Sequence, residues 1–154
     1  MRRQKVSTQS KLPNIAALAR KLDLSRDSIY LYIHLLHSAK LVNTLVQMGK
    51  GVSTLQKPDK IFLENTNLAY ALRERPDTGN LRETFLLNQL LNAGQPVFLP
   101  ESGDFMINDL VIEVGGKNKK SNPEKTPENY IIAADDLEIG YAQRVPLWLW
   151  GFLY

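Results

Sequence analysis

The apolar positions of the first forty residues follow a helical period. In the first segment they recur at i, i+3, i+4 and i+7, namely Ile15, Leu18, Ala19 and Leu22. Ser25 is then a good N-cap for a second helix, which is predicted to run to about Ser38. The apolar face of this second helix is marked by Ile29, Ile33 and Leu36. Two helices joined by so short a connection have helix-turn-helix spacing.

The next two apolar segments have the composition of β-strands. LVNTLVQ (residues 41–47) and DKIFLEN (residues 59–65) are short and β-prone, and the Gly-Lys-Gly of residues 49–51 lies between them. They predict the two strands of a wing, so residues 1–75 are predicted to form a winged helix-turn-helix domain.

A winged helix-turn-helix also predicts where nucleic acid would be contacted. In such folds, base edges and phosphates are reached from the wing tip and from residues early in the second helix that lie off its apolar face. The residues in these positions are Arg26, Ser28, Tyr30, Tyr32 and Lys50. Small winged helices also bind proteins, so packing of the two tyrosines against another domain is an equal alternative.

The second half opens with a strong helical pattern. NLRETFLLNQLLNAG (residues 80–94) predicts a helix that stops at Gly94. Glu83 falls on the same face as Leu87 and Leu90. A carboxylate in an apolar stripe is costly unless it meets a partner, so Glu83 is either a rim residue or part of a buried polar site. PVFLP (residues 96–100) then predicts a short strand.

A β-hairpin is predicted around the dipeptide Asn108-Asp109. GDFMI and LVIEV flank this dipeptide, which tolerates the positive φ angles of a two-residue turn. The resulting register places Asp104 directly opposite Glu113. Like charges in that position destabilise a sheet unless a cation bridges them or one carboxylate is protonated. Mg²⁺ is the natural cation, because it prefers carboxylate and carbonyl oxygens; a solvent-facing pair with a lysine nearby is the alternative.

The last apolar segments predict two more strands. NYIIAADD (residues 129–136) predicts a buried strand that ends in an acidic turn. In this turn Asp135, Asp136 and Glu138 are expected to be solvated rather than to form a second cation site. PLWLWGFLY (residues 146–154) predicts a core or edge strand. Exposed instead, this aromatic segment would suit dimerisation or docking on another domain.

Composition excludes several kinds of chemistry. Hydrophobic residues make up 44% of the 154 residues, enough to close a core in one or two domains. The sequence has no cysteine and two histidines, which excludes disulfides and thiolate chemistry and leaves oxygen atoms as the expected metal ligands. No apolar run approaches the ~20 residues of a membrane span, and the basic N-terminus lacks a secretory apolar region. We therefore expect a cytoplasmic protein without a membrane partner.

The net charge of +3 hides a strong asymmetry. Residues 1–75 carry 13 Lys and Arg against 5 Asp and Glu, whereas residues 76–154 carry 6 against 11. A basic half beside an acidic half suits a module that binds a polyanion such as DNA, joined to a unit with different chemistry. The change falls in a polar stretch with Pro and Gly, residues 73–80, which predicts the boundary between domains 1–75 and 76–154.

The order of the motifs carries a family resemblance. LSRDSIYLYIHLLHSAKLV and DKIFLENTNLAYAL precede RETFLLNQLL, GDFMINDLVIEV and GGKNKK. From Lys11 onward the series resembles the C-terminal part of a family of bacterial AAA-type ATPases, which carry a winged helix and a PD-(D/E)XK nuclease-like domain. The resemblance implies an α+β or α/β protein, in which the winged helix-turn-helix is followed by a small restriction-endonuclease-like domain of mixed α/β structure.

The resemblance also implies a set of site residues. It places a helix glutamate at Glu83, a strand aspartate at Asp104 and an E-x-K motif that begins at Glu113. A working nuclease of this type would hold Mg²⁺ with Asp104, Glu113 and the carbonyl of Val114. The motif's lysine is missing, because position 115 is Gly. Lys117 would take its role if the strand continued, Lys119 and Lys120 are expected in a solvated loop, and the site could equally be inactive.

The nucleotide-binding part of that family is missing as well. No G-x-x-x-x-G-K-[ST] occurs, so no ATP site is expected here, and the chain is expected to be a C-terminal fragment or a separate gene product. The leading hypothesis is a regulatory and binding module whose winged helix contacts DNA or the P-loop ATPase domain. The aromatic tail is a second candidate contact, either with that domain or with another copy of the chain in a homo-oligomer. The alternative is a Mg²⁺-dependent DNA nuclease that uses Asp104, Glu113 and Lys117.

Overall fold

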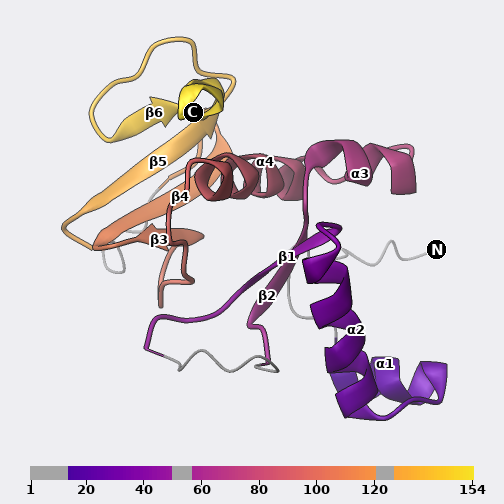
Figure 1. Cartoon of the computed structure of the whole chain (residues 1–154). Helices are drawn as coiled ribbons and strands as arrows, with labels where there is room; N and C mark the ends of the chain where they lie inside the picture. The colour runs from indigo at the N-terminus through magenta and orange to yellow at the C-terminus, as the bar shows by residue number, and fades with distance from the viewer. Residues whose placement is uncertain (1–13, 50–56, 121–126) are drawn as a thin grey trace, which may run out of the picture.

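The computed structural model describes residues 14–49, 57–120 and 127–154, which form a mixed arrangement of helices and sheets. The helices and strands are α1 (Ile15–Leu22), α2 (Arg26–Ser38), β1 (Val42–Leu45), β2 (Lys60–Leu63), α3 (Thr66–Leu72), α4 (Thr78–Asn92), β3 (Phe105–Ile107), β4 (Leu110–Gly116), β5 (Tyr130–Asp135), β6 (Arg144–Pro146) and the 3-10 helix η1 (Leu147–Phe152) (Figure 1). Within these residues, no helix has both the length and the apolar character that crossing a bilayer requires.

The first helix spans the four apolar positions of the predicted pattern, and the second begins and ends where the sequence predicts. Asn14 and Ser25 cap α1 and α2, each accepting a hydrogen bond of 3.0 Å from the backbone N–H three residues later. Asp23 adopts a left-handed conformation, with φ of 53°, and so ends α1. The two helices pack through a small cluster of Ile15, Ala19 and Ile29. The predicted pair of helices across a short turn is therefore confirmed.

The two predicted wing strands form a separate two-stranded sheet. β1 and β2 pair antiparallel, with Val42 opposite Leu63 and Leu45 opposite Lys60. The connection between the strands contains Lys50, which lies outside the described residues.

The second half builds a four-stranded sheet in the order β3-β4-β5-β6 (Figure 1). β3 pairs antiparallel with β4, whereas β4–β5 and β5–β6 are parallel. Residues 80–92 are helical as predicted, within α4, and the helix ends just before Gly94, which has a positive φ of 72°. NYIIAADD supplies β5. PVFLP makes isolated bridges at Phe98 and Leu99 and no regular strand.

The aromatic tail differs from the prediction of a strand. The strand β6 ends at Pro146, and Leu147–Phe152 turn into the 3-10 helix η1, which packs on α4 and buries Leu147. Packing of the segment on α4 buries Leu147, holds Trp150 partly buried against the core, and leaves Trp148 and Phe152 53% and 77% exposed. An alternating core strand would have buried every second residue instead.

One hydrophobic core joins the two halves of the chain. Leu45 and Phe62 of the small sheet belong to the same cluster as Leu86 and Leu87 of α4 and Ile112 of β4. Lys60 also forms a partly buried ion pair with Glu83, 3.0 Å apart. The predicted boundary near residue 75 therefore marks a change in charge and composition, while the apolar packing continues across it.

The shared core predicts that unfolding of the halves is coupled. Phe62, in β2, is 4% exposed, so Phe62→Ala should cost about 3–5 kcal/mol. Both tryptophans, Trp148 and Trp150, lie in η1, so their fluorescence reports the second half. In urea titrations Phe62→Ala should shift the tryptophan transition and the circular-dichroism transition together. Leu72→Ala is the control, because Leu72 is 75% exposed. An unmoved tryptophan transition would show two independent domains.

Candidate functional site

The predicted hairpin forms, with one local change next to the candidate aspartate. Phe105, Met106 and Ile107 pair with Ile112, Val111 and Leu110, and Asn108 has the positive φ of the turn, 53°. Asp104 lies one position beyond the last of these pairs. Its N–H donates to the carbonyl of Ile112, 3.1 Å away, although Ile112 is already the partner of Phe105. The ladder thus departs from regular alternation here, as at a β-bulge, and the predicted direct opposition of Asp104 and Glu113 is replaced by an offset.

The offset turns the Asp104 carboxylate toward the edge of β4. Its Oδ2 accepts a hydrogen bond of 2.8 Å from the N–H of Val114. In a strand, the N–H and C=O of one residue point to the same edge, so the Val114 carbonyl also faces the side where β3 has ended. A carboxylate and a backbone carbonyl therefore share the open end of the hairpin.

Glu113 lies on the sheet face opposite α4. Ile112 and Val114 belong to the core cluster that contains the α4 leucines, and side chains alternate along a strand, so Glu113 projects to the other face. Its side chain is 20% exposed. Its Oε2 is buried and accepts no hydrogen bond from the residues that the structure describes. Pairing with a nearby cation offsets the cost of burying such a carboxylate oxygen.

Lys119 supplies that cation. Its Nζ lies 3.6 Å from Glu113 Oε2. The Lys119 side chain reaches the carboxylate by lying over Gly115: a Cβ built on Gly115 would be 2.8 Å from Cβ, Cγ and Cδ of Lys119. The expectation of a solvated loop is therefore wrong for Lys119. The sequence feature that could have indicated its position is Gly115, whose missing side chain leaves room for the lysine alkyl chain.

Lys117 occupies a different position from the one expected. β4 ends at Gly116, so the strand does not continue far enough to place Lys117 on the face of Glu113. Lys117 is exposed, and its backbone carbonyl accepts a hydrogen bond of 3.1 Å from Arg144 Nη1. Residues 116–119 instead form a turn closed by a 2.9 Å bond from the Lys119 N–H to the Gly116 carbonyl.

Glu83 is not brought to the other two carboxylates. It projects from α4 toward the small sheet, where its Oε2 pairs with Lys60 Nζ at 3.0 Å. α4 covers the face of the four-stranded sheet from which Glu113 points away. Among the described residues no three His, Cys, Asp or Glu side chains form a metal-binding group. The hairpin presents the Asp104 carboxylate at the open edge of β4 and the Glu113 carboxylate on the face of that strand.

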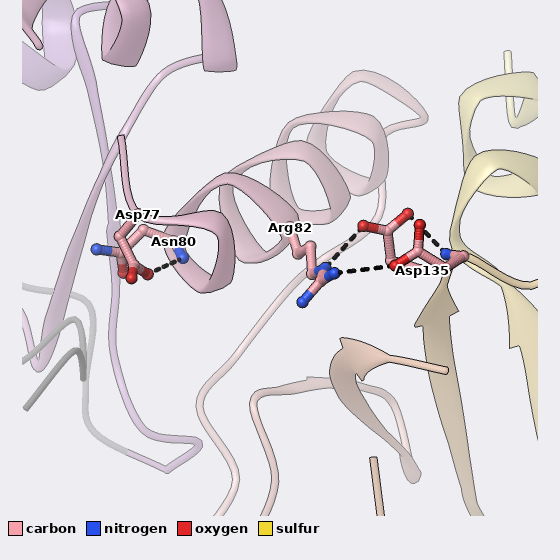
Figure 2. A network of polar contacts seen from close by, with 5 residues as sticks. Asp77, Asn80, Arg82 and Asp135 are labelled. Atoms are coloured by element: carbon pink, nitrogen blue, oxygen red, sulfur yellow. Dashed lines mark hydrogen bonds and ion pairs between the residues drawn. The ribbon is translucent and has the colours of Figure 1, made fainter. Parts of the chain in front are cut away.

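The acidic turn after β5 is paired with an arginine. Arg82 of α4 donates from Nε to Asp135 Oδ2 at 2.7 Å, and its Nη2 lies 3.5 Å from Asp136 Oδ2 (Figure 2). The Asp135 side chain is 40% exposed and that of Asp136 70%. The Arg82 guanidinium therefore places a positive charge beside both carboxylates. Glu138 is exposed.

The residues predicted to contact nucleic acid on α2 divide into two pairs. Arg26 is exposed and Tyr32 is 49% exposed. The Ser28 hydroxyl lies 2.9 Å from that of Ser25, and Tyr30 packs against the α1–α2 cluster. Three leucines of the same helix are exposed: Leu31, Leu35 and Leu36, at 46%, 52% and 41%. The prediction that Leu36 shares the apolar face of Ile29 and Ile33 is therefore wrong, because of these three residues only the two isoleucines join the α1–α2 cluster.

The hairpin end thus combines two carboxylates, a backbone carbonyl and an amine. Its elements are the open end of β3–β4 and the turn that follows β4. No family model, curated protein or solved structure matches the chain. The assignment of a function therefore depends on this arrangement of residues.

Gly115 should be essential for the position of Lys119. In Gly115→Ala the new Cβ would lie 2.8 Å from three Lys119 carbons, so the lysine must move, and we expect a loss of about 1–3 kcal/mol in unfolding free energy. Gly116→Ala is the matched control, because its Cβ would make ordinary contacts of 3.5 Å with Arg82. Chemical denaturation measures both variants. Equal effects would contradict the packing of Lys119 over Gly115.

Proposed function

We propose that the chain carries a divalent-metal-dependent phosphodiesterase centre that acts on nucleic acid, formed by Asp104, Glu113, Val114 and Lys119. The observation that supports it is the Lys119 amine beside Glu113, 3.6 Å from Oε2. Lys119 provides from a turn the amine that the E-x-K motif lacks at Gly115. The proposal includes a restriction-endonuclease-like second half and a winged helix in the first.

The ligand set suits a hard divalent cation. Mg²⁺ prefers carboxylate and carbonyl oxygens and keeps several waters, so two protein carboxylates and one carbonyl suffice. The buried Glu113 Oε2, without a hydrogen-bond donor among the described residues, is an oxygen suited to such an ion. When bound, the cation would supply Lewis-acid charge beside the scissile phosphate.

The protein groups have distinct roles in this proposal. The bond from the Val114 N–H holds the Asp104 carboxylate at the edge of β4, which fixes the direction of one ligand oxygen. Glu113 shares its charge between the cation and Lys119. The Lys119 ammonium is placed to stabilise negative charge as it develops on the phosphate, because fixed charges aimed at that position lower the barrier.

The charge of the chain suggests the polyanionic substrate class. Residues 1–75 carry a net +8, against −5 for residues 76–154. Double-stranded DNA would be retained by the basic half while the acidic half provides the metal ligands. The shared core keeps the small sheet packed against α4 and thus couples the two halves mechanically.

Cleavage assays test the centre directly. Plasmid and linear DNA, incubated with Mg²⁺ or Mn²⁺, should be cut by the wild-type chain. Lys119→Ala should lower the rate about 100-fold or more, since an amine that stabilises the developing charge is lost. Lys117→Ala is the matched control and should cut normally, because Lys117 is exposed and contributes its backbone carbonyl.

Asp104 variants separate charge from folding. Asp104→Asn keeps an oxygen that can accept from the Val114 N–H but loses the charge, whereas Asp104→Ala loses both. Both variants should lose metal-dependent cleavage, and Asp104→Asn should retain more stability. Equal background cleavage by wild type and both variants would show that the centre does not cut DNA.

The apolar surface of α2 supports a second candidate function, a binding module. Leu31, Leu35 and Leu36 are each more than 40% exposed and lie on the helix that would face DNA in a winged helix. Exposed apolar side chains on one helix favour a protein partner, and the P-loop ATPase domain of the resemblance is the partner we infer. DNA would then be held elsewhere.

DNA binding as a function of salt distinguishes the two uses of α2. If α2 docks on a protein, Arg26→Ala should leave the affinity for duplex DNA unchanged within error at each salt concentration. Fluorescence anisotropy with a labelled duplex measures this. A steep fall with salt, together with weaker binding and a smaller salt slope in Arg26→Ala, would show that α2 contacts phosphates and would contradict docking through this helix.

A further inference from the structure

We propose that Arg144 is a positioning residue for Lys119: its guanidinium holds the turn of residues 116–119 so that the lysine amine stays beside Glu113. The inference rests on the proposed function where it assigns Lys119 a chemical role. It goes beyond that function because it makes a residue of β6 responsible for the position of the Lys119 amine. In the sheet, β6 lies two strands away from β4, which carries Glu113.

The guanidinium makes a fork that spans the turn. Arg144 Nη1 donates to the Lys117 carbonyl at 3.1 Å, and Nη2 donates to the Lys119 carbonyl. The turn's own closure is the 2.9 Å bond from the Lys119 N–H to the Gly116 carbonyl. A planar guanidinium can make both bonds at once, whereas a lysine ammonium is a point charge on a flexible stem.

The base of the fork is fixed by the sheet. Arg144 pairs with Ile132 of β5, and its N–H and C=O bond to the backbone of Tyr141 at 2.9 and 3.1 Å. Its guanidinium carbon lies 5.7 Å from the centroid of the Tyr141 ring. Both the backbone and the head group of Arg144 are therefore held in place. The two guanidinium bonds then fix the turn of residues 116–119 relative to β6.

The contacts indicate placement rather than charge neutralisation. Arg144 adds a positive charge to a turn that already contains Lys117 and Lys119, next to Lys120. Its bonds go to two carbonyls of that turn, so its contribution there is geometric. Because the Lys119 alkyl chain lies in contact with Gly115, a shift of the turn moves the amine directly.

Lysine acetylation tests the placement without needing cleavage. We would measure acetylation rates of Lys117, Lys119 and Lys120 by mass spectrometry in wild type, Arg144→Ala and Arg144→Lys. In wild type Lys119 should react severalfold more slowly than Lys117, since its amine is engaged with Glu113. Arg144→Ala should raise the Lys119 rate to that of Lys117, and Arg144→Lys should give an intermediate rate.

The controls separate placement from general loosening. Arg73→Ala removes an exposed arginine and should leave all three rates unchanged. Circular dichroism and thermal melting establish that each variant is folded at the assay temperature; Arg144→Lys serves if Arg144→Ala is unfolded. A Lys119 rate that stays slow in a folded Arg144 variant overturns the inference.

A double-mutant cycle then tests the link to chemistry. Arg144→Ala should lower kcat on the order of 10- to 100-fold with KM little changed, because a misplaced group loses its effect on the transition state. In the Lys119→Ala background it should have no further effect. Equal losses in both backgrounds would overturn the positioning role. If wild type does not cut DNA, the proposed function fails, and the acetylation rates still decide whether Arg144 places Lys119.

Discussion

The burial of α4 against both sheets is the contact from which the rest of the structure follows. Leu86, Leu87 and Leu90 are at most 1% exposed and share one cluster with the small sheet and the four-stranded sheet. Because α4 covers one face of β4, the alternation of the strand directs Glu113 to the opposite face. The Glu113 carboxylate and its partner Lys119 are thereby kept apart from the apolar core.

Two neighbouring charged residues of α4 contact different sheets. Arg82 reaches Asp135 at the end of β5, whereas Glu83 reaches Lys60 of β2. Successive residues on a helix point about 100° apart, so adjacent charges can serve different sheets. From sequence, the apolar stripe of α4 was predictable, but the element that each flanking charge would meet was not.

The same limit applies to the candidate site. The hairpin register could be predicted because a two-residue turn and side-chain alternation are local rules, and Asn108 adopts the required conformation. The shift at Asp104 and the reach of Lys119 depend on the Val114 N–H and on the space above Gly115, which are set by tertiary structure. Periodicity predicted that PLWLWGFLY is an apolar segment that packs, but its length and alternation suggested a strand where packing on α4 gives a 3-10 helix.

Lys119 lies on a turn rather than in a strand, so the position of its amine is separate from the strand pairing of β4. A residue within β4 is tied to the pairing of β4 with β5, so any change in its position disturbs the whole sheet. The turn after Gly116 carries no such pairing in the described residues. A change in its length or composition would therefore move the Lys119 amine while leaving the pairing of β4 with β5 in place.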